Sequence, residues 1–347
     1  MVDAQELHWI CSVPLGATIA AFGILGNIIS ILIWQRIIKS KLRGNQSTAL
    51  YLIALGVCDT GLLVFFLLTD TIKANHPEIV NNYSYAAFFS WFGFPIFFIF
   101  LVASIWLVVG VTLNRFFMIT FPTKVKSMYT TNRTYMGIAV FLAFSVIINI
   151  PHFFSYHPKE TNGTYTLALT EYGESQGSID YEFWVHCIFV VLAPWFTIAV
   201  LNASIVYKLT QQMKKFDSKK DSKGSSKRDK QEKQMTRMLL AVTFSFLVLL
   251  AWQCVTQCFW MLGVGKEDKK SSRWNLIDSS FAFAKTGVVI NSSINWIFYC
   301  LTGTMFRKEM IKMLPLTRIK RGSFTTSSNF KSSTKGTQDT VFANSNV

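Results

Sequence analysis

The sequence predicts an all-α membrane protein, a seven-transmembrane helix bundle with a short amphipathic eighth helix. Hydrophobic residues make up 51% of the 347 residues and charged residues only 15%, and the mean hydropathy is +0.33. Soluble domains average about 25% charged residues. Because a helix needs about 20 mostly apolar residues to cross a bilayer, we expect seven spans, at about residues 10–34, 46–69, 86–118, 134–156, 182–208, 236–263 and 274–301.

Lysine and arginine alternate between the loops that join these spans. One set of loops and the C-terminal region hold 27 of the 34 Lys and Arg residues, whereas the opposite set holds six. Since basic residues concentrate on the cytoplasmic side, we expect a multi-pass plasma-membrane protein with its N-terminus outside and its C-terminus in the cytoplasm. The basic inner face suits anionic lipid. The acidic outer loops either attract a cationic ligand or serve only as solvated surface.

Three segments outside the spans have their own composition. Residues 211–233 are rich in Lys, Ser and Asp without apolar periodicity, which predicts a disordered basic loop and no nucleic-acid role. Residues 304–314 place Phe306, Met310 and Leu314 on one helix face, as in an interfacial amphipathic helix. The chain therefore divides into a seven-transmembrane domain, residues 1–314, and a disordered cytoplasmic tail, residues 315–347.

Polar residues inside the last span form the most informative motif. The run N-S-S-I-N at 291–295 interrupts an otherwise hydrophobic helix and is followed by Tyr299. Polar groups are costly in lipid, so this run should face the protein interior and mark function. Other short motifs recur in the remaining spans, namely Gly26-Asn27, Leu55–Asp59, Asn114-Arg115-Phe116, Pro122, Pro194, Leu201-Asn202 and Thr236–Leu239.

On these motifs, residues 10–314 resemble the rhodopsin-like (class A) G-protein-coupled receptors, and among them the invertebrate FMRFamide-type neuropeptide receptors. Trp296 stands where that family usually has proline. The resemblance implies a receptor that binds an extracellular ligand, here a short neuropeptide, and activates a heterotrimeric G protein. It also implies that receptor kinases and arrestin act on the Ser/Thr-rich tail after phosphorylation. The alternative is a small-molecule or chemosensory receptor of the same architecture.

Asp59 is the carboxylate expected in the middle of the membrane. An Asp there needs a counter-ion or hydrogen-bond donors. In the resembled family, a sodium-and-water pocket forms at the positions occupied here by Asn27, Asp59, Ser104, Asn291, Ser292 and Asn295. Their oxygen atoms suit a small hard cation. A structural sodium ion is one interpretation, and a neutral Asp59 hydrogen-bonded without an ion is the other. No other cofactor or metal is expected.

The resemblance assigns Arg115 to G-protein coupling. The acidic residue that usually precedes it is Asn114 here, so the strong carboxylate–guanidinium pair is missing and the resting state should be less well held. Glu232, near the start of the sixth span, is a candidate substitute partner. Pro122 and Tyr299 complete the coupling residues that the resemblance implies.

A core switch is implied at Ile105, Pro194 and Phe246. Two alignments remain open for the sixth span. One places Leu250 at the family's tryptophan position and Trp252 at its proline position, and the other makes Trp252 the switching tryptophan. In both, the sixth helix lacks proline and should be less kinked.

Two charged residues are expected above Asp59 in a ligand cavity. Asp70 lies three turns beyond Asp59 on the same face, about 16 Å nearer the outside, and Lys285 lies about 10 Å outward of Ser292. They contact a ligand, pair with each other, or do both. Aromatic candidates for the same cavity are Phe97, Phe98 and Phe281.

No disulfide is expected in the outer loops. Ser90 occupies the family's cysteine position in the third helix, and the loop at 152–181 contains no cysteine. Instead, the Asn162-Gly163 turn and the flanking alternation predict a β-hairpin. Asn82 and Asn162 lie in sequons on the outer side and are candidate glycosylation sites.

Other function classes find little support in the chain. There is no H-E-x-x-H motif, phosphate loop or Cys/His cluster, so an enzyme is not expected. A photoreceptor would need a lysine at Val289, and Lys285 is one turn too high. A transporter would normally show repeats or broken helices around several mid-membrane charges.

Overall fold

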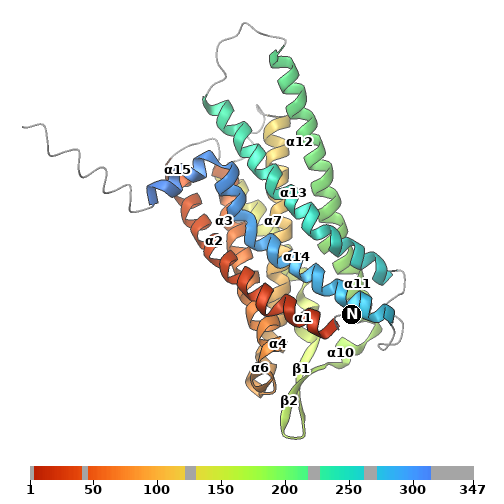
Figure 1. Cartoon of the computed structure of the whole chain (residues 1–347). Helices are drawn as coiled ribbons and strands as arrows, with labels where there is room; N and C mark the ends of the chain where they lie inside the picture. Colours follow the sequence, from red (N-terminus) through yellow and green to blue (C-terminus); the bar gives the residue numbers. More distant parts are fainter. Residues whose placement is uncertain (1–3, 41–45, 122–129, 218–226, 262–271, 314–347) are drawn as a thin grey trace, which may run out of the picture.

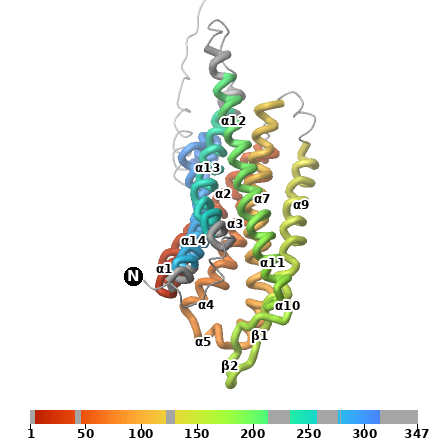
Figure 2. Tube along the Cα trace, turned by 90° about the vertical axis from the view of Figure 1, so that its right-hand side faces the viewer, coloured from red at the N-terminus to blue at the C-terminus, as the bar shows by residue number. Residues whose placement is uncertain are grey.

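The computed structural model describes residues 4–40, 46–121, 130–217, 227–261 and 272–313, which form a bundle of long helices with a β-hairpin at one end (Figure 1). The hairpin and the C-terminal helix α15 (Thr304–Met313) lie at opposite ends, called here the hairpin end and the α15 end (Figure 2). The bundle helices are α2 (Pro14–Lys39), α3 (Gln46–Phe66), α7 (Phe94–Thr120), α9 (Thr131–Ile148), α12 (Ala193–Asp217), α13 (Lys227–Met261) and α14 (Ser272–Thr302).

Shorter elements gather at the hairpin end, and most continue a long helix. Three of them, η1, η2 and η4, are π-helical turns, which recur at functional sites in other proteins. The short elements are α1 (Ala4–Ser12), η1 (Leu67–Thr71), α4 (Ile72–Asn75), α5 (Pro77–Val80), α6 (Tyr83–Phe88), η2 (Phe89–Gly93), η3 (Ile150–Phe154), α10 (Glu171–Glu174), α11 (Gln176–Val185) and η4 (His186–Leu192).

The seven predicted spans appear in the predicted order. Over the described residues, six helical stretches are long and apolar enough to cross a membrane, judged by length and composition. Helix α14, which carries Lys285 and the polar run 291–295, packs against α2 and α13 and completes the bundle. Helix α7 lies at the centre, against α3, α9, α12 and α13. The all-α seven-helix prediction is therefore confirmed.

The predicted disordered loop at 211–233 is wrong at both ends. Helix α12 continues to Asp217, and α13 already begins at Lys227. Lys, Gln and Met are good helix formers, and extending an existing helix avoids the cost of nucleating a new one. Residues 218–226, Pro122, the tail at 315–347 and the side chain of Glu232 lie outside the described residues.

Trp296 packs where α14 meets α2, and a glycine makes room for it. A Cβ atom on Gly26 would lie 2.0 Å from Cδ1 of the Trp296 indole, far inside van der Waals contact. The ring of Phe22, one turn earlier on α2, also packs against the indole, with ring centroids 5.0 Å apart. Small residues at helix interfaces let backbones approach closely in membranes. The tryptophan that replaces the usual proline is thus accommodated by Gly26.

The predicted β-hairpin is confirmed. Strands β1 (Tyr156–Thr161) and β2 (Thr164–Leu169) pair antiparallel and are joined by a two-residue turn. Asn162 and Gly163 have φ angles of 52° and 76°, and such positive angles favour Asn-Gly in tight hairpin turns. The backbone N–H of Tyr165 donates to the carbonyl of Asn81, which ties the hairpin to the segment before α6.

Helix α15 covers the opposite end of α2 and α14. Phe306 is fully buried, with its ring centroid 5.6 Å from that of Trp34 and 5.5 Å from that of Tyr299. Arg307 and Lys308, on the other side of α15, are exposed. This is the apolar and basic division expected of the amphipathic segment, and its position in a membrane interface remains a prediction.

We expect Gly26→Ala to destabilise the protein, because the added methyl group has no room beside the indole of Trp296. Overpacking of this kind costs about 1–3 kcal/mol and should lower the thermal unfolding midpoint of the detergent-solubilised protein. Adding Trp296→Leu to that variant should recover part of the loss. Gly177→Ala is the control, since its Cβ would lie 3.8 Å from the nearest atom. Equal midpoints for the Gly26 and Gly177 variants would contradict the packing argument.

Candidate functional site

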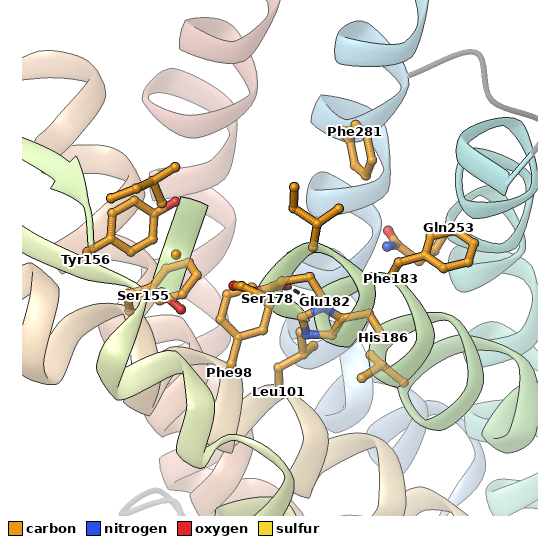
Figure 3. Close-up of a pocket in the computed structure, with 15 residues that line it drawn as sticks. Phe98, Leu101, Ser155, Tyr156, Ser178, Glu182, Phe183, His186, Gln253 and Phe281 are labelled. Carbon is orange, nitrogen blue, oxygen red and sulfur yellow. Dashed lines mark ion pairs between the residues drawn. The ribbon is translucent and has the colours of Figure 1, made fainter. Parts of the chain in front are cut away.

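A cavity of about 460 Å³ lies at the hairpin end of the bundle. Its volume falls within the range of about 300–1,000 Å³ typical of ligand pockets. Figure 3 shows Glu182, Phe183 and His186 from α11 and η4, with Gln253 of α13 beside Phe183 and Phe281 on α14. The lining is mainly apolar and aromatic, and its polar side chains are Ser155, Tyr156, Ser178, Glu182, His186 and Gln253.

Local structure in α11 and η4 directs two ionisable side chains to this cavity. Ser175 caps α11, its hydroxyl accepting a hydrogen bond from the backbone N–H of Ser178 at 3.2 Å. Glu182 and His186 are four residues apart and therefore share a helix face. His186 begins the π-helical turn η4. Figure 3 shows both side chains beside Phe98 of α7.

Glu182 bridges two histidines. One carboxylate oxygen, Oε1, lies 2.9 Å from Nε2 of His152, and the other, Oε2, lies 2.9 Å from Nδ1 of His186. The Phe98 ring stacks on His152 with centroids 4.6 Å apart and lies 4.9 Å from the ring of His186. His152 is completely buried, whereas the Glu182 side chain is 36% exposed. The cavity thus has one anionic point in an otherwise apolar and aromatic wall.

Tyr156, at the start of β1, also lines the cavity. Burial, together with the nearby Glu182 carboxylate, raises the pKa of the Tyr156 hydroxyl. The hydroxyl is therefore neutral at physiological pH and can donate a hydrogen bond to a bound molecule.

Of the two roles expected for Asp70 and Lys285, the structure shows their pairing, and neither residue lines the cavity described above. Their charged atoms, Oδ1 and Nζ, lie 2.7 Å apart, and Lys285 Nζ also donates to Oγ of Ser12 at 3.1 Å. The pair thus joins η1 to α14 beside α1. Phe98 and Phe281 line the cavity as expected, but Phe97 does not.

A second polar centre lies in the middle of the bundle. Asp59 is completely buried and accepts hydrogen bonds from Ser104 Oγ at 2.5 Å and Asn295 Nδ2 at 2.8 Å. Asn27 donates to the backbone carbonyl of Ser292 at 2.9 Å, which connects α2 to the same region. Asn291 is buried as well. The six residues named for a sodium-and-water pocket are therefore all buried. Three of them are joined through Asp59, and Asn27 is bonded to Ser292.

Near the α15 end, Thr48 of α3 accepts hydrogen bonds from two residues of α7. Asn114 Nδ2 donates at 2.9 Å and Arg115 Nη2 at 2.6 Å. Both side chains are buried. Arg115 is thus held by a neutral hydroxyl where the resembled family usually offers a carboxylate. Tyr299 is buried against Trp34, with ring centroids 5.6 Å apart.

Of the two alignments left open for the sixth span, the structure disfavours the one that makes Trp252 the switching tryptophan. Ile105, Pro194 and Phe246 are all buried, but Trp252 is 45% exposed. Leu250 follows Phe246 by four residues and shares its buried face. Trp252 lies two residues further along and therefore points about 200° away from Leu250 around the helix axis. The structure thus favours the alignment that places Leu250 at the family's tryptophan position.

Comparison with known proteins identifies the architecture. Residues 26–299 match the family described as 7 transmembrane receptor (rhodopsin family). The chain belongs to this family. Because rhodopsin-family proteins are receptors, the prediction that the chain is not an enzyme is confirmed. Membership also makes it a multi-pass plasma-membrane protein.

Individual relatives within the rhodopsin family are neuropeptide and hormone receptors by name. The chain is 26% identical over 324 residues to the FMRFamide receptor of Drosophila melanogaster, covering 90% of this chain and 55% of that protein. It is 27% identical over 272 residues to the growth hormone secretagogue receptor type 1 of Oryctolagus cuniculus, which covers 72% of this chain and 67% of that receptor. It is 23% identical over 310 residues to the galanin receptor 2a of Danio rerio, which covers 88% of this chain and 79% of that receptor. The chain thus spans only about half the length of the fly receptor.

Sequence reasoning missed the His152–Glu182–His186 cluster. The histidines appeared scattered at the ends of spans, because residues 152 and 186 are far apart in the chain. The i, i+4 spacing of Glu182 and His186 was the available signal, since an acid and an imidazole on one helix face at the start of a span are seldom lipid-facing. Only the fold brings His152 to them.

We expect Asp70→Ala to lower the thermal unfolding midpoint more than Asp70→Ala combined with Lys285→Ala. The single variant leaves Lys285 without its carboxylate, whereas the double variant removes both charges. Removing one partner of a fully buried pair lowers the free energy of unfolding by about 3–5 kcal/mol. For Asp70→Ala a smaller loss of about 1–2 kcal/mol is expected, because about a quarter of each side chain is exposed to solvent. Lys159→Ala, an exposed lysine on β1, is the control. A double variant less stable than either single variant would contradict a pairwise role.

Proposed function

We propose that the chain is a G-protein-coupled receptor for a short, basic, C-terminally amidated peptide. The observation that carries the proposal is the cavity at the hairpin end, where the Glu182 carboxylate lies in an aromatic wall. The relative with the highest coverage of this chain among those compared above is named for FMRFamide. The letters of that name spell Phe-Met-Arg-Phe-amide, a peptide with one cationic side chain, aromatic side chains and an uncharged C-terminus.

Each part of such a peptide has a counterpart in the cavity. Glu182 can accept a charge-assisted pair of hydrogen bonds from an arginine guanidinium. Phe94, Phe98 and Phe281 offer aromatic faces to a phenylalanine. Gln253 carries both a donor and an acceptor, which suits a terminal amide. Asp70, the other carboxylate expected near the ligand, is paired with Lys285 instead.

The proposal places the hairpin end outside the cell and the α15 end in the cytoplasm. The distribution of Lys and Arg supports this orientation, with 27 residues on the α15 side and six on the other. The same basic side would face anionic lipid, a heterotrimeric G protein, receptor kinases and arrestin. Asn82 and Asn162, both exposed at the hairpin end, would then be accessible for glycosylation.

A small-molecule ligand is the second candidate. The mainly apolar lining and the modest volume of about 460 Å³ favour a compact molecule, and such a cavity would accommodate only part of a longer peptide.

The test is a screen of amidated peptides on cells that express the receptor, read through a promiscuous G protein. We expect a basic amidated peptide to activate it, and Glu182→Gln to reduce its potency about 10- to 100-fold, as for loss of a charged hydrogen bond worth about 1.5–3 kcal/mol. Glu171→Gln, an exposed acid on α10, should leave potency unchanged. Activation by neutral small molecules alone would favour the second candidate, and unchanged potency in Glu182→Gln would remove Glu182 as the anchor.

We further propose that Asp59 holds a sodium ion that favours the inactive bundle. The fully buried carboxylate, the Ser104 hydroxyl and the adjacent buried Asn291 and Ser292 provide the oxygen atoms that a small hard cation requires. Sodium bound there would hold α3, α7 and α14 in one arrangement.

Sodium chloride should therefore weaken agonist binding to wild type, compared with potassium chloride at equal ionic strength. Asp59→Ala should abolish this difference, because it removes the charge on which the ion depends. Radioligand competition in the two salts measures the effect. The same sodium sensitivity in wild type and Asp59→Ala would refute the proposal.

A further inference from the structure

Three metal-ligating side chains from two separate segments meet beside the ligand cavity. His152 comes from η3, whereas Glu182 and His186 come from α11 and η4. One potential ligand atom from each residue lies within 4.8 Å of the other two. The two shortest contacts, from Glu182 to each imidazole, are both 2.9 Å. The three ligand atoms therefore surround one point in space.

The composition of this cluster matches a zinc site. Two imidazoles and one carboxylate form a common ligand set of zinc sites that keep an open position. With bonds of about 2.0–2.1 Å, ligand atoms in tetrahedral coordination lie about 3.3 Å apart. Small side-chain rotations from the observed separations reach that distance. Hard cations such as Mg²⁺ prefer sites made of oxygen alone.

The surroundings of His152 provide a second, independent observation. This side chain is completely buried, and neither of its ring nitrogens has a hydrogen-bond partner among the described residues, although Nε2 lies 2.9 Å from Oε1 of Glu182. The ring is fixed by Phe98, stacked at 4.6 Å, and by Phe94, edge-on at 5.1 Å. A buried imidazole held in this way presents its Nε2 toward Glu182 with little freedom to turn elsewhere. The position is preorganised, which lowers the cost of binding an ion.

The remaining coordination position would face the cavity. Glu182 and His186 both line it, and their side chains are 36% and 15% exposed. A zinc ion between them would have three protein ligands, with a water molecule or an atom of the bound ligand as the fourth. An ion there would also neutralise Glu182.

We propose that His152, Glu182 and His186 form a Zn²⁺ site in the wall of the ligand cavity, and that zinc bound there regulates access to Glu182. The cluster can also persist without metal as a hydrogen-bonded triad, in which each neutral imidazole donates to the carboxylate. Direct measurement of metal binding distinguishes the two.

The experiment is isothermal titration of the purified full-length receptor in lipid nanodiscs with Zn²⁺, and separately with Mg²⁺. We expect one zinc ion per receptor with micromolar affinity, a higher thermal unfolding midpoint with zinc, and no response to magnesium. His186→Ala and Glu182→Gln should each weaken zinc binding at least tenfold. Both positions are partly exposed, so these variants should fold, which their thermal midpoints without metal will show.

His76→Ala is the matched control. His76 and Glu78 form a second His–Glu pair, also at 2.9 Å, but on the exposed surface before α6. This variant should bind zinc as wild type does. Absence of binding below millimolar zinc, or affinity unchanged in His186→Ala and Glu182→Gln, would overturn the proposal. Loss of binding in His76→Ala would place the ion at the surface pair and overturn it equally.

A second measurement links the metal to signalling and rests on the proposed function. Zinc at a concentration equal to its measured dissociation constant should reduce the potency of an activating basic peptide. The bound ion occupies the Glu182 carboxylate that the arginine of the peptide needs. The reduction should be absent in His186→Ala, which retains Glu182 but not the metal. Should no peptide activate the receptor, the titration still decides the metal site by itself. Zinc binding with unchanged peptide potency would remove the regulatory part of the proposal.

Discussion

The buried carboxylate of Asp59 is the constraint on which the helix arrangement depends. A charged or polar group in the middle of a membrane has no water to satisfy it, so the protein must supply its partners. Ser104 of α7 and Asn295 of α14 both donate to Asp59 of α3. These three helices therefore have to meet at one depth and in one rotation. The apolar residues around them can pack in many ways, whereas the hydrogen-bond geometry permits few.

The polar contacts between helices differ in chemical type at the two ends of the bundle. Near the α15 end, Arg115 and Asn114 share the hydroxyl of Thr48, which is a weaker partner than a carboxylate. Near the hairpin end, the Asp70–Lys285 pair joins η1 to α14, and Glu182 joins η3 to η4 through two histidines. Among the described residues, the hairpin end thus holds ionic contacts that join separate helical segments. A molecule or an ion that enters the cavity would act directly on contacts between helices, which is a route from binding to helix movement.

The errors in the sequence-based predictions have a common physical cause. One of the two alignments made Trp252 the switching tryptophan, but its rotation on α13 directs it outward. Asp70 and Lys285 were expected to contact a ligand, each other, or both, and their pairing leaves the cavity to other residues. Glu182 was not singled out because its importance comes from His152, which lies 30 residues earlier in the chain. Helix depth follows from counting residues, whereas rotation and pairing depend on neighbouring helices.

The sequence by itself determined the number and order of the membrane helices, the polar run 291–295, the hairpin turn at Asn162-Gly163 and the family. These features depend on local composition, periodicity and turn chemistry, which are written in consecutive residues. Only the tertiary structure decided that Gly26 makes room for Trp296, that Phe98 rather than Phe97 faces the cavity, and that two histidines meet at Glu182. Those outcomes depend on how separate helices rotate against one another, and nothing in a single helix fixes that rotation.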